Sequence, residues 1–371
     1  MGHGVKAERI DDLGARTQEM KIERLRGWRI ASAVPSGLDD CCLIVPTYCR
    51  PREVVRLLET VKALPDHPAE IIVVDGSQDE LTERAVRRWV ADQHAGFSLL
   101  YARSRAGLTR QRNVGIDLAS GEYVFFLDDD CLPQAGYFAA IRDVFLADER
   151  VGAVGGLAIN QMAQPVPRRW RIRLSLKIVP RVEPGTYHAS GTSVPPNLIR
   201  PFTGTRAVDL LCGAHFAFRR AVFARHRFSE FFAGYAQGED MEFSLRVGRE
   251  WKLLWCGDAR VAHHHAPGGR PAPFAKGKME VRNRYFIWKR HVTDVHLVDR
   301  ARFWFDVILL AAMDVAWFCS RPWQLSWAQH AIGVACGAVG CALAPPRYEE
   351  RLPSVRYVLA EGDDDHASGW S

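Results

Sequence analysis

Between residues 41 and 128 the chain alternates short apolar segments with longer amphipathic ones. The apolar segments are rich in β-branched and aromatic residues, and they are Cys41–Pro46, Glu70–Asp75, Phe97–Ala102 and Tyr123–Asp128. Strands with such continuous apolar character are buried on both faces, which is typical of parallel sheets covered by helices. The intervening segments have helical periodicity, and they are Arg52–Ala63, Thr82–Gln93 and Thr109–Ala119. The pattern therefore predicts an α/β fold with a Rossmann-like, doubly wound, mostly parallel sheet.

This alternation is interrupted after Val151–Ile159. Residues 160–206 form a Pro- and Arg-rich connection. Because a long structureless loop is uncommon inside a compact domain, we expect a functional insertion near the site. The α/β pattern then returns with Val208–Phe218, a helix from about Glu239 to Glu250 and a strand at Lys252–Cys256.

The last hundred residues are different, with a basic segment before Phe303–Ser320 and a second apolar segment, Ala328–Pro345. A spanning helix needs about 20 mostly apolar residues. Phe303–Ser320 has 18 and contains Asp306 and Asp314, so spanning is not expected. The two carboxylates fall on one side of an otherwise apolar helix. Such a helix either packs on the rest of the chain or lies flat in a membrane interface, and the preceding basic residues favour an anionic surface.

Composition narrows the class of protein. The chain has 371 residues, of which 47% are hydrophobic and 25% charged, so disordered, collagenous and coiled-coil classes are excluded. A formal net charge of +6 favours anionic partners without distinguishing phosphate, lipid headgroup and nucleic acid. The nine cysteines include no C-x-x-C pair, and residues 1–30 lack an apolar signal segment. Reduced, buried thiols and a cytoplasmic location are therefore expected.

The strongest chemical signal is the acidic run Asp128-Asp129-Asp130, which directly follows an apolar strand. In an open parallel sheet, the carboxyl edge of the strands is where ligands bind. Adjacent carboxylates repel one another, and a hard divalent cation shared with a substrate phosphate relieves that repulsion. A solvated acidic turn is the alternative, but the like charges at the end of the strand would then have no partner.

Three further segments are expected at the same edge. Val45–Arg50 ends the first strand with a Pro-set turn and an aromatic residue, Tyr48, that can cover a base. Val73–Asp79 ends the second strand with a carboxylate and a glycine turn, which suits a uracil imide or a ribose hydroxyl. Ala106–Gly115 opens a helix whose backbone N–H groups and Arg110 can meet a diphosphate. Each alone is only a turn and a helix cap, but their order and spacing favour a nucleotide site.

These motifs together resemble a known family. VPTY-x-R, VVDG-S-x-D, G-x-x-x-x-RN-x-G and FLDDD, in order across residues 43–130, are similar to the nucleotide-sugar half of the inverting family 2 glycosyltransferases with the GT-A fold. Gly213–Arg220 and Gly238–Arg246, which contains an ED motif, are similar to the acceptor half. The resemblance covers roughly residues 41–290. It implies a GT-A domain over 39–290, divided into a nucleotide-sugar half (39–159) and an acceptor half (160–290), between an N-terminal extension (1–38) and a helical, apolar C-terminal region (291–371).

The resemblance also implies roles for individual residues. The donor-binding residues would be Pro46, Thr47, Tyr48, Asp75, Asp79, Arg110, Asn113, Asp128 and Asp129. Asp128 and Asp130 would form the D-x-D pair that holds a divalent metal, Mn²⁺ or Mg²⁺. Asp240 would be the catalytic base, with Glu239 beside it. Inverting transfer is one displacement at the anomeric carbon, so it needs a carboxylate for the acceptor proton and a cation for the departing diphosphate.

Two further segments leave alternatives open. In many related transferases a histidine after the last sheet strand completes the metal site, which His263 or His264 of the run His263–His265 would suit, whereas a solvated histidine run is the alternative. The stretch from Lys276 to Tyr285 resembles the family's C-terminal basic helix. It would contact donor phosphate or acceptor, or would be an exposed basic helix.

The sequence thus predicts a metal-dependent inverting glycosyltransferase that moves a sugar from a nucleotide sugar, a UDP sugar, to a hydroxyl acceptor. We expect a carbohydrate or lipid-linked acceptor in polysaccharide or glycolipid biosynthesis, no nucleic-acid partner, and peripheral contact with the inner membrane face through residues 282–345. A sugar-phosphate nucleotidyltransferase would have a Gly-rich loop after the first strand, and Val45–Arg52 contains no glycine. A non-catalytic membrane-surface module would have no use for Asp128–Asp130 together with Glu239 and Asp240.

Overall fold

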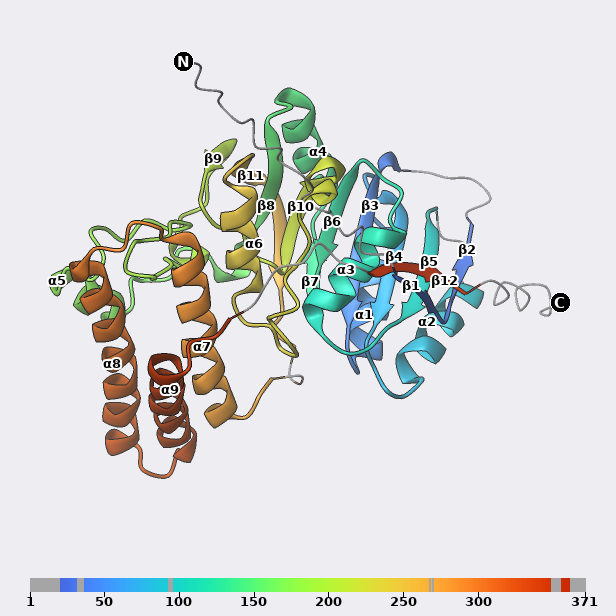
Figure 1. The fold of residues 1–371 in the computed structure, drawn as a ribbon. Helices are drawn as coiled ribbons and strands as arrows, with labels where there is room; N and C mark the ends of the chain where they lie inside the picture. The colour runs from blue at the N-terminus through green and yellow to red at the C-terminus, as the bar shows by residue number, and fades with distance from the viewer. Residues whose placement is uncertain are drawn as a thin grey trace, which may run out of the picture.

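The computed structural model describes residues 21–31, 37–92, 96–266, 268, 270–347 and 355–360. A ten-stranded mixed sheet forms its centre, in the order β2-β5-β4-β3-β6-β10-β8-β11-β7, with β9 paired to β11 (Figure 1). The strands are β2 (Gly27–Ile30), β3 (Leu38–Thr47), β4 (Pro68–Asp75), β5 (Ser98–Arg103), β6 (Tyr123–Leu127), β7 (Cys131–Pro133), β8 (Val151–Ala158), β9 (Thr205–Ala207), β10 (His215–Arg219) and β11 (Lys252–His263).

The four strands expected from the apolar segments are neighbours in this sheet. β5, β4, β3 and β6 pair in parallel. β10 then runs antiparallel between β6 and β8, and β8 pairs in parallel with β11. The register aligns Thr47 at the end of β3 with Asp75 at the end of β4. The predicted mostly parallel α/β sheet is confirmed, and its carboxyl edge gathers the loops that carry the motifs.

Helices cover both faces of the sheet. They are α1 (Pro51–Lys62), α2 (Leu81–Ala91), α3 (Leu108–Leu118), α4 (Tyr137–Ala147) and α6 (Glu239–Val247). Alternate residues of β3 point to opposite faces, so Leu43 packs with α1, α2 and α4, whereas Ile44 packs with α3 and α6. Gly115 permits the close approach of α3, because a Cβ there would lie 2.4 Å from a side-chain carbon of Ile44. This contact fixes which face of α3 meets the sheet.

The predicted insertion is structured. It contains the 3₁₀ turn η1 (Ile159–Gln161), the helix α5 (Arg168–Ser175), a second 3₁₀ turn η2 (Pro196–Leu198) and β9. In the segment Val208–Phe218, where the α/β pattern returns, the strand β10 begins at His215, and a third 3₁₀ turn, η3 (Arg220–Ala224), follows it. The last sheet strand is longer than expected and reaches His263, because its second half pairs with β7 and carries the histidines to the sheet edge.

Three long helices form the C-terminal part: α7 (Pro273–His291), α8 (Leu297–Ser320) and α9 (Leu325–Leu343). In Figure 1 they lie side by side at one end of the sheet. α9 packs closely on α7, since a Cβ on Gly333 would meet the carbonyl oxygen of Phe274 at 2.1 Å. Among the described helices, α8 alone is long and apolar enough to cross a membrane by length and composition.

A small second sheet joins segments that are far apart in sequence. β1 (Lys21–Leu25) pairs in parallel with β12 (Val355–Leu359), and Figure 1 shows β12 beside α3. The amide of Tyr357 donates to Asp117 of α3 at 3.1 Å, and the guanidinium of Arg110 lies 5.5 Å from the Tyr357 ring centre. β1 from the predicted N-terminal extension and β12 from the predicted C-terminal region thus meet on the outer surface of α3.

Candidate active site

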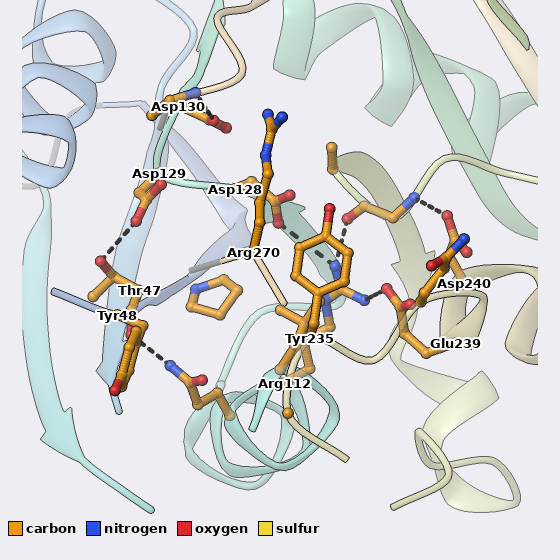
Figure 2. Close-up of a pocket in the computed structure, with 18 of the residues that line it drawn as sticks. Thr47, Tyr48, Arg112, Asp128, Asp129, Asp130, Tyr235, Glu239, Asp240 and Arg270 are labelled. Atoms are coloured by element: carbon orange, nitrogen blue, oxygen red, sulfur yellow. Dashed lines mark hydrogen bonds and ion pairs between the residues drawn. The ribbon is translucent and has the colours of Figure 1, made fainter. Parts of the chain in front are cut away.

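A cavity of about 730 Å³ opens at the carboxyl ends of β3 and β6. The start of α6 forms its opposite wall (Figure 2). The sequence-predicted residues that line it are Pro46, Thr47, Tyr48, Asp128, Asp129, Asp130, Glu239, Asp240 and His263. Segments up to 224 residues apart, from Pro46 to Arg270, therefore contribute to a single cavity.

The three carboxylates that follow β6 have different surroundings. Asp129 accepts hydrogen bonds from the hydroxyl of Thr47 at 2.7 Å and from Arg50 at 2.8 Å. Asp130 accepts one from the amide of Ala266 at 2.7 Å. The carboxylate of Asp128 lies 3.5 Å from Arg112 and keeps 31% of its side chain exposed towards the cavity. Burial raises the pKa of Asp128 to about 6 and that of Asp129 to about 7.

Asp130 and His263 form a pair of ligand atoms suited to a hard cation. The Oδ1 atom of Asp130 is buried and has no hydrogen-bond partner among the residues that the structure describes, and it lies 3.4 Å from Nε2 of His263. Burial lowers the pKa of His263 to about 4, so its ring is neutral and keeps a lone pair at neutral pH. Cys131 completes the local cluster, but burial raises the pKa of its thiol well above the usual value. Carboxylate and imidazole are thus the available donors, and this oxygen–nitrogen pair fits Mn²⁺ better than Mg²⁺, which prefers oxygen ligands.

The histidine run is divided by the end of β11. His263 and His265 line the cavity, with ring centres 4.0 Å apart. His264 is exposed, and its backbone amide donates to the carbonyl oxygen of Asp130 at 3.0 Å. The structure therefore brings the side chain of His263 to the acidic segment and places His264 on the outside of the cavity wall.

The ED motif begins α6 directly after Gly238, whose φ of 91° is in the left-handed region that favours glycine. Asp240 accepts hydrogen bonds from the amides of Gly213 at 2.9 Å and Met241 at 2.8 Å. Gly213 also allows close approach, because a Cβ there would lie 2.9 Å from Cβ of Asp240. The two amide donors therefore fix the orientation of this carboxylate at the start of α6.

Arg112 connects the two acidic groups of the cavity. It is 1% exposed, donates to Glu239 and to the carbonyl oxygen of Gly213 at 2.8 Å each, and lies 3.5 Å from Asp128. Figure 2 shows it between Asp128 and Glu239. Burial, followed by the charge of Asp240, raises the pKa of Glu239, and the charge and hydrogen bond of Arg112 oppose that rise. Arg112 is therefore the counterion of both acidic groups and fixes their separation.

Four predicted donor residues do not line the cavity. Asp75 is fully buried and accepts from Ser77 and Tyr101. Asp79 is exposed, and its carboxylate caps the first turn of α2 through the amide of Leu81. In this arrangement the first carboxylate shapes the turn after β4, and the second begins the following helix.

The other two are in α3. Arg110 pairs with Glu23 of β1 at 2.8 Å, on the side of α3 that carries β12. Asn113 is buried and exchanges two hydrogen bonds of 2.9 Å with the backbone of Phe228. Asn113 thus fastens the loop after β10 to α3, and neither side chain faces the cavity.

Sequence reasoning assigned no role to Arg112 or Arg50, although both line the cavity. The helical period contained the signal for Arg112: it lies three residues before Gly115, on the face that approaches the sheet, whereas Arg110 lies five residues before it. The signal for Arg50 was weaker, since it is only the last residue of the VPTY-x-R motif. It binds Asp129 and also the carbonyl oxygens of Ala266 and Gly268, so its role depends on a segment more than 200 residues away.

The fold is that of a GT-A glycosyltransferase. Residues 42–227, half of the chain, match the model of glycosyl transferase family 2, and the chain belongs to that family. The predicted family resemblance is confirmed.

Individual proteins show the same relationship. A solved structure of mannosyltransferase PcManGT from Pyrobaculum calidifontis, in complex with GDP-Man and Mn²⁺, matches with a TM-score of 0.50 and 19% identity, over 84% of this chain and 90% of that one. The GalNAc(5)-diNAcBac-PP-undecaprenol beta-1,3-glucosyltransferase of Campylobacter jejuni is 32% identical over 88 residues, 24% of this chain and 28% of that protein. Glycosyltransferase AglE of Haloferax volcanii is 32% identical over 102 residues, 27% of this chain and 33% of that protein. The chain thus spans about a third or less of these two curated relatives.

Proposed function

We propose that this protein transfers a sugar from a UDP sugar to an acceptor hydroxyl with inversion at the anomeric carbon. One observation carries the proposal: a single cavity contains two side chains suited to binding a cation, Asp130 and His263. A separate carboxylate, Asp240, lies on the facing wall. A leaving diphosphate needs the first and an attacking hydroxyl needs the second. Family membership supports the same reaction.

On this proposal, the nucleoside binds along Pro46, Thr47 and Tyr48, and Asp128, Asp130 and His263 hold the metal. The half-exposed ring of Tyr48 offers a stacking surface for the base. Asp75 and Asp79 act indirectly, by shaping the turn after β4 and the start of α2. A bound divalent ion would supply Lewis-acid stabilisation of the diphosphate.

Asp240 is the proposed base. The acceptor oxygen forms a bond to the anomeric carbon as the bond from that carbon to the diphosphate oxygen breaks, and the diphosphate keeps the electron pair. The acceptor proton moves to the carboxylate of Asp240, which its two amide donors hold in position. Glu239, paired with Arg112, orients the beginning of α6 and keeps Asp240 facing the cavity.

The proposed acceptor is a carbohydrate or a lipid-linked saccharide, in a polysaccharide or glycolipid pathway. The Campylobacter jejuni relative carries an undecaprenol-linked acceptor in its name, which supports this class. We further propose that residues 39–290 form the catalytic unit. The protein would act in the cytoplasm, peripherally on the inner membrane face through residues 282–345.

Substitution of Asp240 by Asn tests the assignment of the base. The variant should bind UDP with Mn²⁺ as the wild type does, by calorimetry, while turnover falls by about 10³-fold because the proton acceptor is lost. Asp143→Asn, an exposed carboxylate of α4 outside the cavity, is the matched control and should leave both unchanged. Unchanged turnover in the Asp240 variant would show that Asp240 is not the catalytic base.

The donor is tested separately by a hydrolysis and binding screen of nucleotide sugars with Mn²⁺ or Mg²⁺. Because the Pyrobaculum calidifontis enzyme holds GDP-Man, the screen includes GDP sugars beside UDP sugars. Turnover of UDP sugars supports the proposal, and exclusive use of GDP sugars would contradict the nucleotide assignment. If no nucleotide sugar is bound or turned over, the proposed reaction fails.

A further inference from the structure

We propose that α8 and α9 form a docking hairpin whose outward apolar face inserts among the headgroups of an anionic lipid bilayer. This inference extends the membrane contact proposed above. It rests on the proposed function only in taking a lipid bilayer as the surface to which the hairpin binds. Its evidence lies in the direction of the side chains on the two helices, which is independent of the catalytic site.

On α8 the carboxylates lie on the side that faces the protein, together with the buried Phe303 and Val307, and further apolar side chains face outwards. Its carboxylates point inwards: Asp306 is fully buried between Arg173 of α5 and Arg284 of α7, at 2.6 Å from each. Asp314 is buried against His330 of α9, also at 2.6 Å. Residues at helical spacing on the opposite side are exposed and apolar, and they are Ala301, Phe305, Ile308, Ala312 and Val315. The side of α8 that faces outwards is therefore suited to an apolar environment.

α9 also has an exposed apolar side. No acidic residue occurs between Leu325 and Leu343. One side of the helix packs on α7 through Gly333 and Gly337, where added Cβ atoms would meet the α7 backbone at 2.1 and 2.9 Å. The large apolar residues on its other side are more than half exposed, and they are Leu325, Ile332, Val339 and Leu343. An apolar surface this large on one hairpin marks an interaction site.

The tip of the hairpin has the composition of a membrane–water interface. Trp323 is 74% exposed between the two helices, and Trp317 is also exposed and stacks on Trp327. The guanidinium of Arg321 lies 5.1 Å from the Trp317 ring centre. Tryptophan and arginine favour the headgroup level, because each combines an apolar body with a polar end.

Charge selects a bilayer over a second copy of the chain. The exposed cations beside the apolar face include Arg300 on α8 and Arg321 at the tip. α5, which packs on Leu309 of α8, adds the exposed Arg168 and Arg171. Two copies that met through this face would bring cationic margins together, whereas anionic headgroups would pair with them.

The docking hairpin is also connected to the candidate active site. Asn283 of α7 donates to the carbonyl oxygen of Gln237 at 2.8 Å, and Gln237 lines the cavity. α7 therefore joins the packed side of α9 to the wall where an acceptor would enter. A membrane-held hairpin would place the cavity within reach of an acceptor anchored in the same bilayer.

Vesicle flotation of the whole chain tests the inference. The wild type should float with vesicles that contain phosphatidylglycerol, less with pure phosphatidylcholine, and less again when the salt concentration is raised to 1 M. The double variant Ile308→Glu/Val339→Glu should lose about tenfold or more in partitioning, because each substitution places a carboxylate on the inserting face.

The matched control is Leu81→Glu/Leu146→Glu, which places two carboxylates at exposed leucines of α2 and α4 and should float as the wild type does. Circular dichroism and thermal melting check that both double variants are folded. Wild-type flotation by the Ile308/Val339 variant, or failure of the wild type to float, would overturn the proposal. So would a dimer, in the absence of lipid, that the variant converts to monomer. Donor turnover without vesicles is measured in parallel, so loss of lipid binding is distinguishable from loss of the reaction.

Discussion

The buried aspartates at the cavity and those in the C-terminal helices have different surroundings. At the cavity, one oxygen of Asp130 is buried without a hydrogen-bond partner among the described residues, beside a neutral histidine. In the C-terminal helices, Asp306 is fully buried with an arginine on either side. A buried charge is costly unless it is paired. The incomplete pairing at the cavity therefore indicates a place for a ligand, whereas the complete pairing at Asp306 indicates a structural joint.

The same comparison applies to the apolar residues. In the sheet, apolar side chains point to the core and the polar groups gather at one edge, as in most globular proteins. In α8 the carboxylates are inside and Phe305, Ile308 and Val315 are outside. The apolar surface of the sheet is therefore buried inside the protein, whereas the apolar surface of the docking hairpin needs an external partner to cover it.

The largest effect is expected when the ion pairs of Arg112 at the cavity are removed. Arg112→Met should lower the free energy of unfolding by about 3–5 kcal/mol, because it leaves the buried Glu239 and its neighbour Asp128 without their cation. Urea unfolding measures the change. Donor turnover should be lost as well, because the start of α6 is no longer fixed.

Arg110 is the matched control, two residues away on the same helix. Its partner Glu23 is partly exposed, and Arg110→Met should cost only about 0.5–1 kcal/mol. Equal losses for the two variants would contradict the different roles given to these arginines. A normal turnover in the Arg112 variant would show that α6 is positioned by other contacts.

Much of the first region could be predicted from the sequence. The central parts of β3 and β4, Cys41–Val45 and Ile71–Val74, are apolar at every position, and this local pattern was enough to place them in a parallel sheet. The acidic run could be placed at the cavity because it directly follows a strand, and the ED motif because it resembles the acceptor half of the family. The face of α3 was harder to predict, since its motif contains both Arg110 and Arg112 and only the contact of Gly115 with Ile44 distinguishes them.

The second region could be predicted less well, because its partners are distant in sequence. The sequence placed Asp306 and Asp314 on one side of a helix, but whether that side faced water or protein depended on Arg173, 133 residues before Asp306. The pairing of β1 with β12 joins segments more than 300 residues apart and had no local signal. Such long-range pairings are set by tertiary packing.

An intermediate effect is expected at the contact between α7 and α9. Gly333→Val should destabilise the C-terminal helices by about 2–3 kcal/mol, because its side chain would collide with the backbone around Phe274. Gly340→Val is the matched control, because an added Cβ at that position meets nothing within 4 Å. It measures the general cost of valine in a helix without the collision. Limited proteolysis should release the C-terminal helices only in the first variant, with UDP binding retained in both. Equal proteolysis of the two variants would mean that α9 does not depend on this close contact.

The smallest effect is expected at the pairing of His330 with Asp314 inside the docking hairpin, whose contribution to stability depends on pH. Hydrogen bonds to Asp314 and Glu280 raise the pKa of His330 to about 9, whereas an unfolded histidine titrates near 6.5. The stabilisation is therefore complete below about pH 6.5 and is lost as the pH rises through about 9. We expect a contribution of ~1–2 kcal/mol, reduced by the partial exposure of the ring. Urea unfolding of the wild type and of His330→Gln should differ at pH 6 and converge at pH 9.5. A difference that is equal at both values would mean that His330 stabilises the hairpin by packing, and that Asp314 does not need a charged partner.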